Sequence, residues 1–216
     1  HDLRNILSSA QLFVDRIESS EDPLVRRLAP KLVGSITRAV NLCESTLAFG
    51  RAEEPPPRLQ WVRLTEIASD VAESEELASG EHEVEITAEI SPGLEVRADG
   101  EQIHRVLTNL VRNARQAIQS SRKPGEIRIT SSEDDEAWWI KVEDTGPGLP
   151  RKALDHLFQP FQGGVSRGGA GLGLAIAAEL VRGHGGRLEL ERSGADGTSF
   201  AIQLPKSNIA LDSAAE

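Results

Sequence analysis

Hydrophobic residues recur at three- and four-residue intervals through the first 50 positions, and this spacing predicts two amphipathic helices. The apolar stripes run over residues 3–17 and 24–47, separated by a polar turn at 19–23. Pro30 should kink the second helix or delay its start. Two helices with one stripe each bury too little surface to be stable alone. We therefore expect a helical hairpin that pairs with a second copy as a four-helix bundle.

The stiff polar segment at 53–57 breaks this pattern with three consecutive prolines and predicts a domain boundary. Beyond it, helices and strands alternate without a strict βαβ rhythm, which favours an α+β fold, a sandwich with helices on one face of a sheet. The expected organisation is a hairpin at 1–54, a linker at 55–62, a second domain at 63–206 and a frayed tail at 207–216. Within the second domain we predict helices at 63–79, 99–120 and 171–183, and strands at 83–90, 126–132, 137–143, 187–192 and 198–204.

Composition narrows the classes of partner. The 216 residues carry a formal charge of -10 without a local Lys/Arg cluster, which argues against binding to nucleic acid or to anionic lipid. No apolar run approaches the ~18 residues that span a bilayer. The lone Cys43 reads as a small buried side chain in a reducing compartment. We expect a cytoplasmic piece of a longer protein, because the chain lacks methionine and begins on His1; any sensor or membrane-anchored part would precede it.

Polar residues on two predicted helices are candidates for chemistry. At 100° per residue, His1 lies opposite the first apolar stripe and faces solvent, with Asn5 one turn further on. Asn109 and Asn113 lie four residues apart at the polar edge of the long helix, so they can meet one ligand together. Asparagine oxygens suit Mg²⁺ and add no charge that would repel a triphosphate. Taken alone, two helical asparagines are more often ordinary surface residues.

Two glycine-containing turns complete the candidates. Asp144 ends a predicted strand and opens Asp144-Thr145-Gly146-Pro147-Gly148, where a carboxylate can accept a hydrogen bond from the exocyclic amine of adenine. Gly169, Gly171 and Gly173 then lead into a predicted helix, whose free N–H groups favour phosphate. Each signal has an ordinary reading by itself, as a surface turn or a flexible connection.

Order and spacing make the set more specific. It resembles the N, G1, F and G2 boxes of the ATPase domain of sensor histidine kinases, a GHKL-type α/β sandwich, and the segments His184-Gly185-Gly186 and Gly197-Thr198-Ser199-Phe200 extend the likeness. The start of the chain resembles the H box of the phosphoacceptor and dimerisation hairpin, so the resemblance covers nearly the whole sequence. The boxes are His1-Asp2-Leu3-Arg4-Asn5, Asn109-Leu110-Val111-Arg112-Asn113-Ala114, Asp144-Thr145-Gly146-Pro147-Gly148, Phe158-Gln159-Pro160-Phe161 and Gly169-Ala170-Gly171-Leu172-Gly173-Leu174.

The resemblance implies a binding site for ATP with Mg²⁺. Asn113 would bind Mg²⁺ on the triphosphate, with Asn109 beside it, while Asp144 would recognise adenine with support from Thr198. Residues 149–170 would form a mobile lid. The glycines implied to shape the adenine end or to close over the phosphates are Gly146, Gly148, Gly169, Gly171 and Gly173.

The resemblance also implies a reaction and its partners. His1 would attack the γ-phosphorus, with Asp2 as the adjacent base, and the phosphoryl group would pass to an aspartate in the receiver domain of a response regulator. Asn5 matches the position that orients water for dephosphorylation of the regulator, so a phosphatase activity is a further expectation. The protein would act as a homodimer. The ATP-binding domain would swing on the linker prolines at 55–57 to reach His1.

Two departures from the pattern and two rival functions remain open. Ile6 replaces a usual proline, and Gln116 stands three residues after Asn113, where a basic residue is common. An ATPase of the gyrase, mismatch-repair or chaperone type would carry a general-base glutamate where this chain has Asn109, which disfavours hydrolysis. A docking scaffold with an inactive ATP site is the other alternative, and nucleotide binding would distinguish it.

Overall fold

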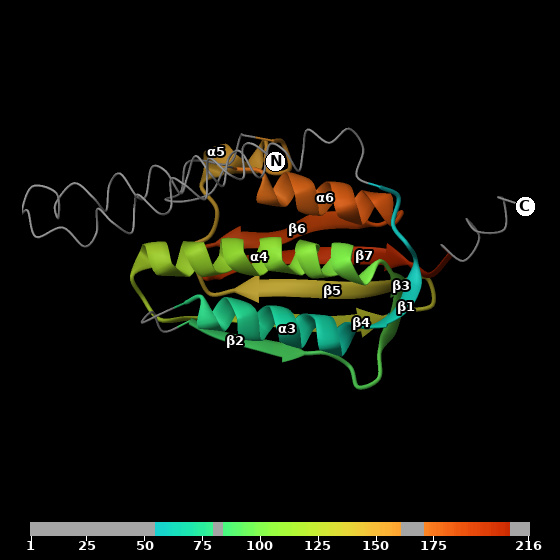
Figure 1. Ribbon diagram of the computed structural model, residues 1–216. Coiled ribbons are helices and arrows are strands. Elements are labelled where there is room, and N and C mark those ends of the chain that lie inside the picture. Colours follow the sequence, from blue (N-terminus) through green and yellow to red (C-terminus); the bar gives the residue numbers. More distant parts are fainter. Residues whose placement is uncertain (1–54, 80–83, 161–170, 208–216) are drawn as a thin grey trace, which may run out of the picture. The chain divides into compact units, whose positions relative to one another are not determined.

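The computed structural model describes residues 55–79, 84–160 and 171–207 (Figure 1). The predicted hairpin, including His1, Asp2, Asn5 and Cys43, lies outside these residues, as do 161–170 of the predicted lid and the tail from 208. The four-helix bundle and the domain boundary therefore stay predictions. Within the described part of the chain, no helix has both the length and the hydropathy needed to cross a membrane.

A five-stranded mixed sheet forms the base of the domain. The strand order is β2-β4-β5-β7-β6, in which β2 runs parallel to β4 and every other neighbouring pair is antiparallel. This confirms each strand that the sequence predicted. The strands are β2 (Val84–Glu89), β4 (Gly125–Glu133), β5 (Ala137–Asp144), β6 (Arg187–Gly194) and β7 (Gly197–Pro205).

Three helices lie over one face of this sheet, as predicted: α3 (Leu64–Leu77), α4 (Gly100–Ser121) and α6 (Gly173–Gly183) (Figure 1). The long central helix α4 begins where it does because Asp99 caps it, its carboxylate accepting from the backbone N–H of Glu101 and of Gln102. The helix ends at Arg122, which adopts the left-handed conformation with φ of 56°.

The core lies between the helices and the sheet. Trp138 on β5 is buried and Trp139 is half-buried, as the alternation of a strand predicts. The stripe expected on α4 is buried in full and packs against the sheet, which confirms the predicted orientation of this helix: Ile103, Val106, Leu107, Leu110, Val111, Ala114 and Ile118.

Three short elements were not predicted: β1 (Gln60–Arg63), β3 (Glu95–Ala98) and α5 (Arg151–Leu154). β1 pairs antiparallel with β3 as a separate two-stranded sheet, so residues that we assigned to the linker contribute a strand. The strand was missed because it lacks an alternating apolar pattern. Trp61, its largest side chain, is 56% exposed and forms a T-shaped pair with the buried Trp138, at 5.8 Å between ring centroids.

The proline segment is held against the ends of two helices. Gln102 Nε2 on α4 donates to the Pro55 carbonyl oxygen at 3.1 Å, and the Arg58 N–H donates to Asp99 Oδ2 at 3.0 Å. The Asp99 N–H in turn donates to Nε2 of His184, the residue that ends α6, at 3.0 Å. Backbone and side-chain bonds thus join the segment at 55–58 to the N-terminus of α4 and the C-terminus of α6.

Candidate functional site

Asp144 lies at the C-terminal end of β5, where Thr198 on β7 is its cross-strand partner. Both residues are buried, with exposed fractions of 7% and 3%. The Gly146 N–H donates to Asp144 Oδ1 at 2.8 Å, and the backbone N–H and hydroxyl of Thr198 also donate to the carboxylate. The structure therefore brings together three residues that the sequence assigned to one site.

The electrostatics of this carboxylate are set by opposing effects. Burial raises the pKa of Asp144 above its ordinary 3.8, while the Gly146 and Thr198 donors and the charge of Arg192 act in the opposite direction. A carboxylate accepts about four hydrogen bonds, so three protein donors leave one position for a ligand. Such a buried acceptor selects a ligand that offers a donor, because an unpaired group there would be costly.

Two close backbone approaches at this end of the sheet require glycine. Gly148 has φ of +76°, and a Cβ there would overlap the Gly194 carbonyl oxygen on β6. At Gly197 φ is +120°, and a Cβ would overlap the Asp144 carbonyl oxygen. From the sequence we did not predict Gly197 as a site residue, although it directly precedes Thr198 in the segment that resembles the family. Its role is to let the start of β7 lie against Asp144.

The polar edge of α4 meets the beginning of α6. Asn109 is only 6% exposed and Asn113 is half-buried. A Cβ on Gly173, the first residue of α6, would lie 3.3 Å from Asn109 Oδ1 and 3.7 Å from Asn113 Nδ2. The two asparagines thus converge on a helix N-terminus that no side chain caps. Free N–H groups and the helix dipole make such a terminus favourable for an anion.

The donor set at this junction fits a cation that arrives with a polyphosphate. The amides of Asn109 and Asn113 offer hard oxygen atoms, the type that Mg²⁺ accepts. They carry no charge, so the pair alone would hold a divalent ion weakly. Phosphate oxygens would have to complete the coordination.

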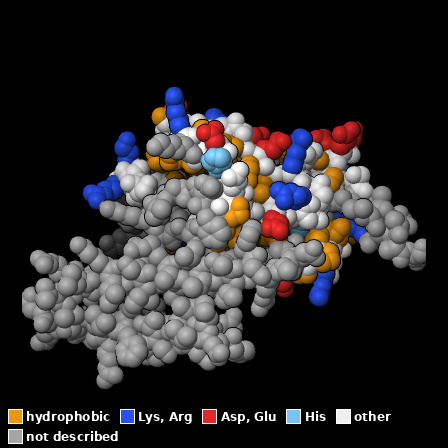
Figure 2. All heavy atoms as spheres, turned by 90° about the horizontal axis from the view of Figure 1, so that it is seen from above, with side chains coloured by type: hydrophobic (Ala, Val, Ile, Leu, Met, Phe, Trp, Pro, Cys, Tyr) orange, Lys and Arg blue, Asp and Glu red, His pale blue; other side chains and the backbone are white. Residues whose placement is uncertain are grey.

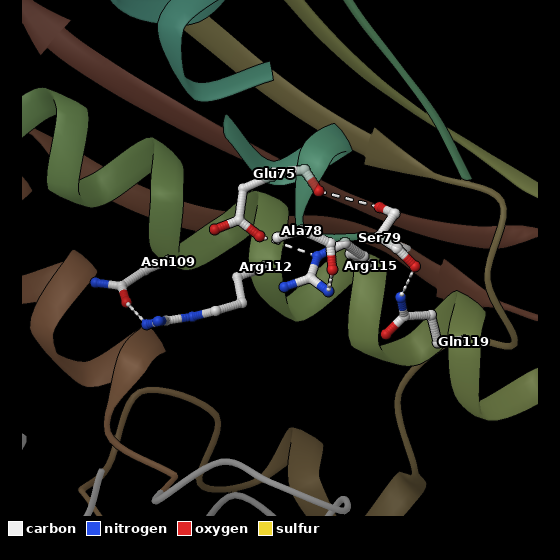
Figure 3. Close-up of polar contacts among 7 residues, drawn as sticks. All are labelled: Glu75, Ala78, Ser79, Asn109, Arg112, Arg115 and Gln119. Atoms are coloured by element: carbon white, nitrogen blue, oxygen red, sulfur yellow. Dashed lines mark hydrogen bonds and ion pairs between the residues drawn. The ribbon is translucent and has the colours of Figure 1, made fainter. Parts of the chain in front are cut away.

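From the sequence we assigned no role to Arg112, which lies between the two asparagines on α4. Its Nη2 donates to Asn109 Oδ1 at 3.1 Å, whereas Arg115 reaches the other way to Glu75 Oε2 at 2.9 Å (Figure 3). An arginine in a helix is too ordinary to stand out in a sequence. The spacing of three residues from Asn109 was the available signal.

The segment between the two ends of the site is attached to the sheet at both sides of α5. The Leu149 N–H donates to Ser193 Oγ on β6 at 2.7 Å, and the Phe158 ring meets Phe200 of β7 edge-on at 6.5 Å between centroids. Gly171 follows the undescribed stretch with φ of +69°, and Gly169 lies outside the described residues. A mobile lid at 149–170 therefore stays a prediction.

The described surface near these elements carries mixed charge. In Figure 2, basic and acidic side chains are interspersed with hydrophobic ones on the face in view, without a broad field of one sign over its described part. Binding of an anionic ligand therefore depends on particular groups at the site rather than on a general attraction.

Comparison with known proteins shows the family to which this domain belongs. The family described as "Histidine kinase-, DNA gyrase B-, and HSP90-like ATPase" matches residues 98–208, from the end of β3 to beyond β7. The chain belongs to this family. The matched residues contain Asn109, Asn113, Asp144 and Thr198, so membership covers every element that builds the candidate site.

Curated proteins that are similar to this chain include sensor histidine kinases. The chain is 33% identical over 219 residues to the sensor histidine kinase RppB of Synechocystis sp., covering 95% of this chain and 47% of that protein. It is 33% identical over 224 residues to the sensory histidine kinase/phosphatase NtrB of Escherichia coli O157:H7, covering 95% and 60%. The chain thus spans about half the length of these curated relatives.

Solved structures of histidine kinases share the fold. Full-length ShkA in complex with AMPPNP matches with a TM-score of 0.74 at 27% identity, over 95% of this chain and 44% of that one. Histidine kinase ThkA in complex with the response regulator protein TrrA matches with a TM-score of 0.69 at 24% identity, over 97% and 60%. The resemblance to sensor histidine kinases is therefore confirmed, together with the GHKL-type fold of the second domain.

Proposed function

We propose that the protein is an ATP-dependent histidine kinase that phosphorylates itself on His1 and passes the phosphoryl group to an aspartate of a response regulator. One observation carries the proposal: a buried carboxylate with a free acceptor position and an uncapped helix start lined by two amides lie on one family-specific ATPase fold. These features suit the two ends of ATP.

The adenine end is formed by β5 and β7. Ionised Asp144 would accept a hydrogen bond from the exocyclic amine, held in place by Thr198 and by the Gly146 N–H. The turn through Gly148 would keep side chains away from the base. A carboxylate acceptor favours adenine over guanine, which presents an oxygen at the equivalent position.

The phosphate end is formed by α4 and α6. Asn113 would hold Mg²⁺ together with phosphate oxygens, with Asn109 beside it, and the bound ion would neutralise charge that develops on the transferred group. The N–H groups at the start of α6 would bind phosphate oxygens. Gly173 has room for this approach because it brings no side chain against the amides.

The transfer itself uses residues outside the described part of the chain. A ring nitrogen of His1 would bond to the γ-phosphorus as the bond to the β–γ bridging oxygen breaks, ADP leaves, and Asp2 accepts the imidazole proton. A regulator aspartate would then take the phosphoryl group. Asn5 would orient a water molecule for dephosphorylation of the response regulator. NtrB, a relative at 33% identity, is named kinase and phosphatase, which supports testing both activities.

The partners follow from the same proposal. The hairpin at 1–54 would pair with a second copy in a homodimer and present His1 to a receiver domain, while ATP and Mg²⁺ are bound by the α/β domain. Relatives named as sensor histidine kinases support the kinase part of this proposal. This part of the protein would lie in the cytoplasm, and any sensor or membrane-anchored part would precede it.

Incubation with γ-labelled ATP and Mg²⁺ tests the function. We expect acid-labile, base-stable label on the wild type, none on His1→Gln and none on Asn113→Ala, with ATP binding kept in His1→Gln. Label that survives His1→Gln would disprove the assigned acceptor. ATP hydrolysis without label would favour the gyrase-like alternative, and absence of nucleotide binding would leave the scaffold alternative.

A further inference from the structure

Arg112 lies on α4 beside the phosphate end of the proposed site, and among the residues that the structure describes it has no acidic partner. Its guanidinium donates to Asn109 Oδ1 at 3.1 Å, the same oxygen that lies against Gly173 at the start of α6. Through Asn109 Oδ1 the positively charged guanidinium of Arg112 is held close to the N-terminus of α6, where an anion is favoured. The side chain of Arg112 is otherwise exposed.

The other arginine on this part of α4 is not available for the same task. Arg115 forms an ion pair with Glu75 at 2.9 Å and donates to the Ala78 carbonyl oxygen at 3.1 Å, and its side chain is 12% exposed (Figure 3). Moving it would leave a buried carboxylate unpaired, which is costly. Within the described residues, by contrast, no carboxylate pairs with Arg112.

The surroundings of the site call for a local cation. The chain has a net charge of -10, and neither amide of α4 adds positive charge. Gln116, one turn beyond Arg112 on the same edge, is neutral. A guanidinium presents five N–H donors, of which the bond to Asn109 occupies one, so several remain for phosphate oxygens.

From this arrangement we infer that Arg112 binds the phosphates of the nucleotide directly. The inference deepens the proposed function and rests on it, because it requires ATP at this site. In the free protein the guanidinium of Arg112 is hydrogen-bonded to the Asn109 side chain. When phosphate arrives, the charged acceptor replaces the neutral amide as the stronger hydrogen-bonding partner. Arg112 then sets the preference for nucleotides that carry phosphate over the bare nucleoside.

The test compares binding of ATP, ADP and adenosine to the whole chain by calorimetry, with and without Mg²⁺. Arg112→Gln should weaken ATP binding by about 10-fold or more and ADP binding in the same direction, and should leave adenosine unchanged. The salt dependence of ATP affinity should become shallower. Arg112→Lys should keep part of the affinity, because a point charge remains without the planar fork.

Two further variants separate charge from structure. Lys123→Gln removes the same charge from an exposed residue after α4 and should leave all three affinities unchanged. Arg112→Gln/Gln116→Arg restores a guanidinium one turn along the same edge and should recover ATP affinity by about 3-fold or more relative to Arg112→Gln.

The outcomes are distinct. Equal weakening of ATP and adenosine in Arg112→Gln would show that Arg112 only supports Asn109, and unchanged ATP affinity would show that it has no part in binding; either result overturns this inference alone. A wild-type chain that binds neither ATP nor adenosine would overturn the proposed function as well.

Discussion

At the scale of single residues, burial shifts the pKa of two groups, Asp144 at the candidate site and His184 at the C-terminus of α6. Asp144 and His184 are both nearly inaccessible, and both have a shifted pKa for which loss of solvation is the leading cause. Asp144 keeps an acceptor position for a ligand, whereas both ring nitrogens of His184 are bonded to backbone groups. Recognition of the ligand is therefore the role proposed for Asp144, whereas the bonds of His184 are structural.

Asp144→Asn should weaken ATP binding by about 10- to 100-fold, the range for a lost charge-assisted hydrogen bond. It should also narrow the preference for ATP over GTP, because an amide can donate to the guanine oxygen. Titration with both nucleotides measures this. Asp135→Asn, at an exposed turn residue, is the matched control. Retention of the full preference in Asp144→Asn would exclude Asp144 from base recognition.

His184 should make the domain less stable in mild acid. Its Nε2 accepts from the Asp99 N–H at 3.0 Å and its Nδ1 lies 2.8 Å from the Leu180 carbonyl oxygen, so the ring fits as the neutral Nδ1–H tautomer. Burial lowers its pKa below the ordinary 6.5. The folded pKa lies below the unfolded one. The stability contribution is therefore complete above pH 6.5 and is lost as pH falls through the lowered pKa.

Urea unfolding between pH 7.5 and 5 checks this expectation. Wild type should lose up to about 1.4 kcal/mol of unfolding free energy per pH unit in the acidic part of the range, and His184→Gln should show a shallower slope. The control is His104→Gln, at an exposed position on α4. Parallel slopes for wild type and His184→Gln would refute the assignment.

At the scale of elements, α4 is joined to its neighbours by polar contacts as well as by its apolar stripe. At the end of α3, Arg115 pairs with Glu75 and donates to the Ala78 carbonyl oxygen, while Gln119 Nε2 donates to the Ser79 carbonyl oxygen at 3.3 Å (Figure 3). These bonds satisfy carbonyl groups that a helix end leaves open. They fix the C-terminus of α3 against the helix that carries the asparagines.

Removing one partner of the Glu75–Arg115 pair should therefore destabilise the domain by about 3 kcal/mol, because the other charge is left buried. Glu75→Leu and Arg115→Met should each show this loss in urea unfolding, and the double variant should recover much of it. Glu66→Ala breaks the exposed pair with Arg63 and should cost less than about 1 kcal/mol. Equal effects at both pairs would contradict this account.

Local patterns made some of these elements predictable from sequence and left others hidden. The α4 stripe has helical period, and Asp144 ends a strand with clear alternation, so both were visible. The Glu75–Arg115 pair joins residues 40 positions apart, and no local pattern reports such a contact. The β1–β3 pairing was hidden because the side chains of β1 are mostly exposed. Arg112 was hidden because its significance depends on where α6 begins.

At the scale of the whole molecule, the proline segment at 55–57 is the expected connection between catalytic domain and phosphoacceptor. It is bonded through Pro55 and Arg58 to the start of α4, and the ring of Pro57 approaches the position of a Cβ on Gly183 at 3.8 Å. These contacts lie at the N-terminus of α4 and the C-terminus of α6. The phosphate end of the proposed site, by contrast, includes the N-terminus of α6. Force applied at the linker would act on both helices that build the phosphate end.

Replacing Pro55, Pro56 and Pro57 by glycine should change the rate of autophosphorylation while leaving ATP affinity within about 2-fold, because flexible residues transmit orientation poorly. Single-turnover labelling and calorimetry on the same variant separate the two effects. Gln102→Ala should shift the rate in the same direction, since it releases Pro55. An unchanged rate in both variants would remove the linker from control of the reaction.

The parallel pairing of β2 with β4 has a consequence for motion. Parallel neighbours cannot be joined by a tight turn, and here the chain returns through β3 and α4 before β4 begins. The helix with Asn109 and Asn113 is thus the crossover itself, and detaching it would pull apart the edge of the sheet. Amide protons of α4 should therefore exchange with solvent only through global opening, whereas those of α5 exchange earlier. Nucleotides would enter by rearrangement around a stationary α4.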